Sequence, residues 1–506
     1  MTVSNLIVKA AGLMFKIPLT ALIGEEGMGY FNGAYTLFTW FYMLSAAGLP
    51  TATSMLIAKL PDKRRQDGAM RIFKTSLSIF TMVGLIGCLI LIFASRPISN
   101  IMRVENSRLA IIAVAPTLFF VCQSAALRGY FQGFGELKWH SLSQVVEALG
   151  KVGLGVALAY HAVETGKSIP TAAAYAAIGI TVGVAAGMVV LYIAFLFKKK
   201  QGGERELTPR RTLARSLIKA ALPITLSSSV MSLANLIDSL IMTRSLHAVG
   251  MSQAEVAAIW GNYSSLAVPM FNLPPVLTMP IAYALLPSLS SALALKKHDE
   301  ALKLTSDALR QTAFIALPCA VGMSVFAKPI LSLLFADDVA ARGAMLLTLL
   351  APSSMLLCLL GVTNTILQAS GHERIPLYAM LCGALMKFIA TWALTPYFGK
   401  YATPISTFIC YFTVIIISLV AIALITPLGK AVTFTDFMKP LISAAIAVTF
   451  AAIVYPFGGT VIAVLIAAVC YFGVSELTQI HPTQKSNRKD VQNENTNRSI
   501  KSKNTL

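Results

Sequence analysis

Apolar runs of about 20 residues recur along almost the whole 506-residue chain, and they restrict its fold more than any other feature. A helix of this length crosses a hydrocarbon layer of roughly 30 Å and satisfies its backbone hydrogen bonds internally. Apolar residues form 56% of the chain and charged residues 12%, which excludes an ordinary soluble domain. The sequence therefore predicts an all-α integral membrane protein.

About fourteen such runs can be delimited by hydropathy. They cover residues 4–24, 31–58, 72–95, 108–128, 141–161, 171–197, 214–243, 256–290, 306–327, 344–369, 375–396, 403–425, 438–455 and 459–477. The stretch MFNLPPVLTMPIAYALLPSL is predicted to hold a kinked or broken helix, because an internal proline removes a backbone hydrogen bond. The first run carries two lysines and lacks a cleavage site, so we interpret it as a span rather than a signal peptide.

Lysine and arginine concentrate in alternate connections and in the C-terminal tail. They are frequent in PDKRRQDGAMR, KKKQGGERELTPRR, LKKHDEALK and residues 485–503, and absent from GEEGMG and YPFGG. Basic loops remain cytoplasmic, so both termini are predicted on the cytoplasmic side. The same bias accounts for the net charge of +19 without a nucleic-acid partner, and the tail is expected to attract anionic membrane lipids.

No motif for catalysis, nucleotide binding or metal binding is visible. The seven cysteines fall singly in predicted spans, at Cys88, Cys122, Cys319, Cys358, Cys382, Cys410 and Cys470. None has the CxxC or Cys/His spacing of a metal site, and a Walker A loop is absent. We therefore predict neither ATP-driven transport nor hydrolytic catalysis, no cofactor and no metal, and we leave Na⁺ or H⁺ open as a coupling ion.

An internal repeat organises the chain. A shift of 236 residues brings APTLFFVCQSAALRGYFQGFGELK onto APSSMLLCLLGVTNTILQASGHER. The identities are Ala115, Pro116, Cys122, Gln132 and Gly135 with Ala351, Pro352, Cys358, Gln368 and Gly371, then Ala148, Leu149, Lys151, Ala157 and Leu158 with Ala384, Leu385, Lys387, Ala393 and Leu394. Six runs separate the copies, so the halves share one orientation about an axis along the membrane normal.

The repeat predicts two parallel six-helix lobes and a terminal helix pair. We expect an N-lobe over 1–200, a basic linker over 201–213, a C-lobe over 214–425, a helix pair over 426–477 and a disordered tail over 478–506. Lobes related in this way bind substrate between them near the bilayer midplane and rock to give alternating access.

Charged residues inside the predicted spans are the candidate site. Lys9 and Lys16 lie seven residues apart on one face of the first span. A lysine near the centre of a span costs about 2.5–3.5 kcal/mol on insertion scales, so two of them indicate a wet or anion-filled interior. Snorkelling to the interface is the alternative for Lys9.

The fourth and fifth spans carry further polar residues. Ser124, Arg128 and Gln132 recur every four residues, and Arg128 could receive an anionic group or cap the span. Glu147 and Lys151 are spaced i, i+4 and could form a private ion pair. Arg128 and Glu147 correspond to Asn364 and Gly383 in the second copy, so the first lobe holds more buried charge and is expected to bind an anion first.

Asn235 and Asp238 stand one turn apart in the seventh span, and Lys387 lies in the eleventh. A lone carboxylate inside a membrane suggests a proton or sodium carrier. A pair between Asp238 and Lys387 in place of a bound cation is an equal alternative.

Three stretches carry a family resemblance: LIGEEGMGYF, then LRGYFQG followed by SQVVEALGKVG, and then IAYALLPSLSSALA. They resemble segments of the polysaccharide-transporter branch of the multidrug/oligosaccharidyl-lipid/polysaccharide exporter superfamily, which includes stage V sporulation protein B and the MurJ-type lipid II flippases. Members commonly have Arg at the positions of Lys9 and Lys16, and some use an acid of the seventh span in a cation site. Lys provides a point charge where Arg provides a bidentate fork.

The resemblance implies a flippase of the bacterial plasma membrane. Its substrate would be an undecaprenyl-diphosphate-linked glycolipid, with lipid II favoured, and cell-wall synthesis enzymes would be its partners. The implied site for the substrate comprises Lys9, Lys16, Arg128, Gln132, Lys151 and Lys387, with Asn235, Asp238 and Glu147 in ion coupling or ion pairing. A flippase for another lipid-linked polymer, a cation-coupled multidrug exporter and an assembly scaffold remain as alternatives.

Overall fold

The fold is seen in a computed structural model of the chain. It describes residues 2–46, 48–58, 60, 65–102, 104–197, 209–429 and 435–477. Within these ranges almost all of the backbone is helical and no strand occurs, which confirms the predicted all-α class. Ten segments of the described chain are long and apolar enough to cross a membrane. The predicted tail over 478–506 and residues 201–208 of the predicted linker lie outside the described residues.

The first half of the chain forms seven α-helices and a short 3₁₀ turn among the described residues. They are α1 (Thr2–Ala46), α2 (Leu49–Ala58), α3 (Arg65–Phe93), α4 (Ser95–Ile101), η2 (Glu105–Ser107), α5 (Arg108–Gly133), α6 (Leu137–Glu164) and α7 (Ile169–Leu196). Helix α1 is interrupted at Gly24, whose φ of 68° and ψ of −179° are open at low cost only to glycine. The interruption separates the two apolar runs predicted at 4–24 and 31–58.

The second half begins with α8, whose first residue, Arg210, falls inside the predicted linker. Its elements are α8 (Arg210–Ala248), α9 (Gln253–Asn262), the π-helical turn η3 (Tyr263–Ala267), α10 (Val268–Phe271), α11 (Leu273–Ala294), α12 (His298–Val325), α13 (Ala327–Ser332), α14 (Asp337–Ala369), α15 (Arg374–Phe398), η4 (Gly399–Tyr401), α16 (Ala402–Ile425) and α17 (Thr435–Leu477). The proline-rich run over 256–290 is broken into α9, η3, α10 and α11, as predicted.

Helix α17 is interrupted at Gly459, with φ of 70° and ψ of −178°. If α1 and α17 count as two helices each and the segments from α9 to α11 count as one, the described residues make fourteen long passes. This number agrees with the fourteen apolar runs of the sequence.

Two compact units can be distinguished. The first consists of Met1–Pro269, Leu334–Leu346 and Ala384–Ser406, and the second of Met270–Leu333, Leu347–Gly383 and Thr407–Leu506. The first unit includes every described helix assigned to the predicted N-lobe, together with α8, α9 and parts of α14, α15 and α16. The lobe limits drawn from the repeat stay a prediction.

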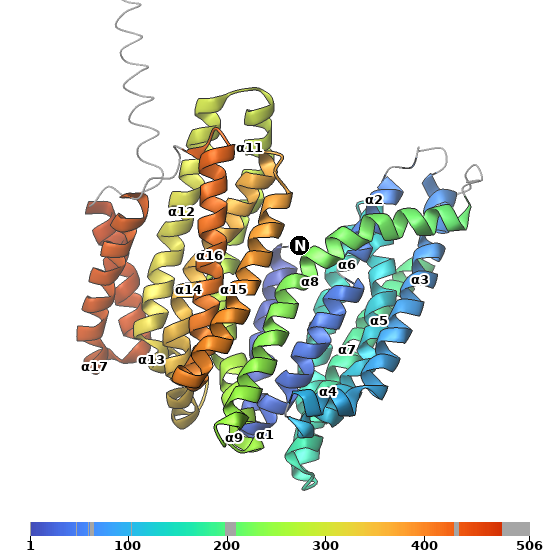
Figure 1. The fold of residues 1–506 in the computed structure, drawn as a ribbon, viewed down its shortest axis with the longest axis horizontal. Helices are drawn as coiled ribbons and strands as arrows, with labels where there is room; N and C mark the ends of the chain where they lie inside the picture. Colours follow the sequence, from blue (N-terminus) through green and yellow to red (C-terminus); the bar gives the residue numbers. More distant parts are fainter. Residues whose placement is uncertain are drawn as a thin grey trace, which may run out of the picture. The chain divides into compact units, whose positions relative to one another are not determined.

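The first unit is built around a core of large apolar side chains from α1, α3 and α5. Phe15, Leu19, Phe31, Phe80 and Phe131 are fully buried there. Helices α3, α5, α6 and α7 run side by side in this unit (Figure 1). The core fixes α1 against α5 and α6, whose polar side chains form the site described below.

Helices α6 and α7 approach closely through glycines. Gly150 faces Gly183, and Gly155 faces Gly179, so that an added Cβ at Gly183 would lie 2.7 Å from the carbonyl oxygen of Glu147 and from the amide nitrogen of Lys151. Small residues allow backbones in a membrane to approach in this way. The contact therefore fixes the stretch of α6 that carries Glu147 and Lys151.

In the second unit, α17 packs against α12. The Tyr471 hydroxyl donates to the carbonyl oxygen of Phe314 at 2.8 Å, and Phe326 packs in a cluster with Val448 and Ala451.

Candidate functional site

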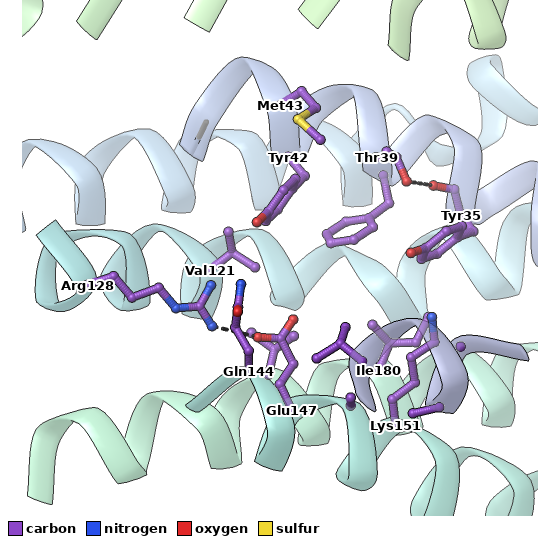
Figure 2. Close-up of a pocket in the computed structure, with 16 residues that line it drawn as sticks. Tyr35, Thr39, Tyr42, Met43, Val121, Arg128, Gln144, Glu147, Lys151 and Ile180 are labelled. Carbon is purple, nitrogen blue, oxygen red and sulfur yellow. Dashed lines mark hydrogen bonds and ion pairs between the residues drawn. The ribbon is translucent and has the colours of Figure 1, made fainter. Parts of the chain in front are cut away.

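A cavity of about 340 Å³ lies inside the first unit, among α1, α5, α6 and α7. Its lining residues are Val8, Ala11, Gly12, Tyr35, Phe38, Thr39, Tyr42, Met43, Val121, Arg128, Gln144, Glu147, Ala148, Lys151, Ile180 and Val184. Figure 2 shows Arg128 and Lys151 entering it from opposite ends, with Glu147 between them. The cavity combines two cations, one carboxylate and several aromatic rings.

Arg128 and Glu147 form an ion pair across α5 and α6. Arg128 Nη2 lies 2.8 Å from Glu147 Oε2, and Arg128 Nε donates to Ser143 Oγ at 3.4 Å. The side chains are 9% and 29% exposed, so the pair is largely shielded but still borders the cavity. The planar guanidinium of Arg128 carries several donors, so it can bind the Glu147 carboxylate and the Ser143 hydroxyl at once.

The predicted private pair of Glu147 with Lys151 is wrong. Although the spacing i, i+4 places both on one side of α6, the Lys151 ammonium points to aromatic rings instead. Its Nζ lies 4.5 Å from the ring centroid of Tyr35 and 5.1 Å from that of Phe15. Within the described part of the chain Lys151 makes no ion pair, and its charge is stabilised by the π faces of the rings.

Sequence reasoning missed the aromatic and amide residues of the cavity. Tyr35, Thr39 and Tyr42 come from α1 after the break at Gly24, and Gln144 comes from α6. The spacing of Tyr35, Thr39 and Tyr42 at i, i+4 and i+7 is that of one helix face, as is the spacing of Gln144, Glu147 and Lys151. A search for polar helix faces in the predicted spans could therefore have found them.

Lys16 lies beside this cavity but does not line it. Its Nζ donates to the carbonyl oxygen of Ser264 at 2.5 Å, in the π-helical turn η3. Its charge is close enough to that of Lys151 for the two to interact. The Lys9 side chain lies outside the described residues, although the backbone of Lys9 belongs to α1.

Asp238 and Lys387 form a second ion pair, which joins α8 to α15. Lys387 Nζ lies 2.6 Å from Asp238 Oδ2, with side chains 3% and 2% exposed, and the Thr391 hydroxyl donates to Asp238 Oδ1 at 3.2 Å. The geometry matches the ion-pair alternative of the two that the sequence left open. No cluster of three metal-ligating side chains occurs in the described ranges.

Two predicted site residues stand apart from these groups. Asn235 is exposed on α8, although it is one turn from the buried Asp238. Gln132 is half-buried on α5, one turn beyond Arg128, and is not part of the cavity wall.

A third polar network lies where α1 breaks. Glu25 Oε1 accepts from Arg342 Nε at 2.6 Å, and Glu25 Oε2 accepts from Asn262 Nδ2 at 2.9 Å. Arg342 also donates to Asp338 at 2.8 Å. One carboxylate thus connects α1, α9 and α14 inside the first unit.

Comparisons with known proteins agree with this architecture. A family profile described as "Polysaccharide biosynthesis protein" matches residues 1–293, and the MatE profile matches residues 223–393. Stage V sporulation protein B of Bacillus subtilis (strain 168) is 24% identical over 393 residues, covering 76% of this chain and 74% of its own. Lipid II flippase MurJ of the same organism is 21% identical over 414 residues, covering 77% and 75%.

Solved structures show the same fold. A structure of lipid II flippase MurJ in an inward closed conformation aligns with a TM-score of 0.74 at 14% identity, covering 94% of this chain and 98% of that one. The polysaccharide biosynthesis profile spans more than half of the 506 residues. The chain therefore belongs to the polysaccharide biosynthesis protein family, in the polysaccharide-transporter branch of the multidrug/oligosaccharidyl-lipid/polysaccharide exporter superfamily.

Proposed function

We propose that the protein is a flippase that moves an undecaprenyl-diphosphate-linked cell-wall precursor, with lipid II favoured, from the inner to the outer leaflet of a bacterial plasma membrane. The observation that carries the proposal is the cavity in the first unit, where Lys151 rests on Tyr35 and Phe15 beside the Arg128–Glu147 pair. Enzymes of cell-wall synthesis would consume the lipid on the outer face. The names of the relatives point to the same class of substrate.

The electrostatics suit a diphosphate headgroup. About two negative charges must leave water, and fixed cations in a shielded cavity replace the lost hydration. Lys151 provides one such charge without a carboxylate competitor among the described residues. Arg128 can provide a second if the diphosphate replaces Glu147 on its guanidinium fork. The polyprenyl chain needs no polar path, since it remains in the hydrocarbon.

The size of the cavity limits what it holds. At about 340 Å³ it lies near the lower end of small-molecule sites, which run from about 300 to 1,000 Å³. It accommodates a diphosphate but is small for a complete glycolipid headgroup. We infer that the sugar extends beyond this cavity, and that the cavity selects for the diphosphate rather than for the sugar.

A flippase for another lipid-linked polymer is the second candidate, because stage V sporulation protein B is at least as similar in sequence as the lipid II flippase. The multidrug exporter is less favoured, because the single carboxylate in the cavity wall is already paired with Arg128.

Transport of a dianionic headgroup outward is assisted by an inside-negative potential, by roughly 2.3 kcal/mol per charge per 100 mV.

The proposal is tested in proteoliposomes that contain the full-length protein and one defined lipid at a time: lipid II, a lipid-linked teichoic-acid unit, or neither. We expect Lys151→Gln to slow translocation roughly 10-fold or more, since a charge-assisted hydrogen bond contributes about 1.5–3 kcal/mol. Lys167→Gln is the matched control, because Lys167 Nζ also lies 4.5 Å from a tyrosine ring but is on the surface.

Equal translocation rates for Lys151→Gln and the parent would show that the cavity is not part of the transport path. Translocation of organic cations without any lipid-linked sugar would favour the exporter. Faster translocation of the teichoic-acid unit than of lipid II would make the teichoic-acid unit the favoured substrate.

A further inference from the structure

A second cavity, of about 320 Å³, lies between α3 and the first turns of α8. Its lining residues are Lys74, Thr75, Ser78, Ile79, Arg210, Arg211 and Ala214. Both helices belong to the first unit, and the beginning of α8 crosses toward α3 in Figure 1. It shares no lining residue with the cavity of Arg128 and Lys151.

The charge of this cavity is entirely positive. Lys74, Arg210 and Arg211 contribute three cations, and no carboxylate is among the lining residues. Helix α8 adds to the positive field, since Pro209 at its N-cap makes no side-chain cap and its first turn has no acid. The amide groups at such a helix start lack intrahelical acceptors and attract anions. The Ser78 hydroxyl is exposed beside them.

An apolar surface begins directly beside the cations. One turn beyond Ser78, α3 presents a stripe of exposed apolar side chains, consisting of Met82, Leu85, Ile86, Leu89, Ile90 and Phe93. On α8, Ile218 and Leu222 are exposed as well. Exposed apolar residues on a spanning helix face lipid, so the cavity lies where a lipid-facing surface meets a cationic end.

We propose that this cavity binds the phosphate of an anionic membrane phospholipid, whose acyl chains lie along the exposed stripe of α3. The cations and the amide groups at the start of α8 recognise the phosphate, and the stripe provides apolar contact that a free anion cannot use. Because the bound lipid contacts both α3 and α8, its affinity depends on how these two helices are arranged. The site is independent of the transported substrate.

The test measures lipid binding by the full-length protein in neutral detergent. Dioleoyl phosphatidylglycerol, dioleoyl phosphatidylcholine, inorganic phosphate and undecaprenyl phosphate are titrated separately while the thermal unfolding midpoint is followed, since a ligand of the native state raises it. We expect phosphatidylglycerol to bind at least 10-fold more tightly than the other three. Dihexanoyl phosphatidylglycerol, whose chains are too short for the stripe, should bind at least 10-fold more weakly than the dioleoyl lipid.

Two double variants of α8 separate a specific site from general attraction. Arg210→Gln with Arg211→Gln should weaken binding of phosphatidylglycerol at least 10-fold. Arg215→Gln with Lys219→Gln removes the same charge from exposed positions of the same helix outside the cavity, and should change binding less than twofold. Lys74→Gln on α3 provides a second test if the arginine variants fold poorly, as judged by their midpoints without lipid.

Three results would overturn the proposal. Equal weakening in both double variants would show a diffuse electrostatic effect. Equal binding of inorganic phosphate would show an anion site without a lipid contact. Preference for undecaprenyl phosphate would assign the cavity to the transported lipid.

Discussion

Buried charges in the first unit are stabilised in different ways. Asp238 and Lys387 neutralise each other in a nearly inaccessible pair, and Arg128 is held by Glu147 at the cavity wall. Lys151 relies on the rings of Tyr35 and Phe15. Because a ring stabilises a cation less than a carboxylate does, Lys151 has the most to gain from an incoming anion.

The Asp238–Lys387 pair predicts a strong coupling between two substitutions. Asp238→Asn alone should remove the carboxylate that neutralises the buried Lys387 ammonium and lower the free energy of unfolding by about 3–5 kcal/mol, whereas adding Lys387→Met should restore most of that loss. The measurement is the unfolding midpoint of both single variants, the double variant and the parent, together with their transport rates. A double variant as inactive as Asp238→Asn, combined with sodium-dependent binding in the parent, would instead support a carrier role for Asp238.

At the scale of the elements, α6 and α7 hold the cavity in shape through their glycine contacts. Gly183 lies against the backbone of Glu147 and Lys151, the two charged residues by which α6 lines the cavity. A side chain there would separate the helices and displace both groups. Gly153 lies on the same helix as Lys151 and has no atom within 4 Å of an added Cβ.

Gly183→Ala should therefore destabilise the protein by about 1–3 kcal/mol, the usual cost of overpacking, and slow transport as well. Gly153→Ala should leave both unchanged or raise stability slightly, since alanine has the higher helix propensity. Unfolding midpoints and transport rates of the two variants provide the comparison. If both variants behave alike, the close contact of α6 with α7 has no special part in the site.

At the scale of the molecule, the first unit brings together segments distant in sequence. Glu25 and Arg342 are 317 residues apart and form one ion pair. Around it, a Cβ at Gly29 would overlap the carbonyl oxygen of Ala257, and one at Gly261 would overlap that of Glu25. If residues 1–200 rock against residues 210–425, as the repeat predicts, this contact of α1 with α9 has to open during the cycle.

Arg342→Gln should make the contact of α1 with α9 open more often, because it removes the ion pair between Arg342 and Glu25. Ser265, which is buried and accepts a hydrogen bond from Asn32 at 2.6 Å, is the reporter position. We expect Ser265→Cys to be labelled by a soluble thiol reagent roughly twofold to fivefold faster when Arg342→Gln is added, since a partly exposed ion pair contributes up to about 1 kcal/mol. Site-resolved mass spectrometry distinguishes this cysteine from the seven native ones.

Lys297→Gln is the matched control. Lys297 is 56% exposed and pairs with Glu300 at 3.0 Å, whereas Arg342 is 53% exposed. The control should leave labelling of Ser265→Cys unchanged. If Arg342→Gln also leaves it unchanged, Glu25 and Arg342 do not hold this contact closed.

Hydropathy and charge placement predict the helices and the charged residues of both buried ion pairs in advance of any structure. Length and hydropathy suffice to predict the long apolar helices of the described chain, because each helix satisfies its own hydrogen bonds and needs no partner to exist in lipid. A charged side chain inside a membrane is costly, so charges within the predicted spans mark candidate functional residues. This argument identified Arg128, Glu147, Lys151, Asp238 and Lys387.

The pairing of these residues depends on how the helices pack against one another. The i, i+4 spacing predicted an ion pair between Glu147 and Lys151. In the packed structure Glu147 pairs with Arg128 of α5 instead, and the Lys151 ammonium lies over the Tyr35 ring of α1. Lys16 likewise finds its acceptor 248 residues away, in a π-helical turn that hydropathy does not reveal. Hydropathy measures the transfer of one helix from water to lipid, whereas partners depend on the rotation and crossing of helices that side-chain packing alone sets.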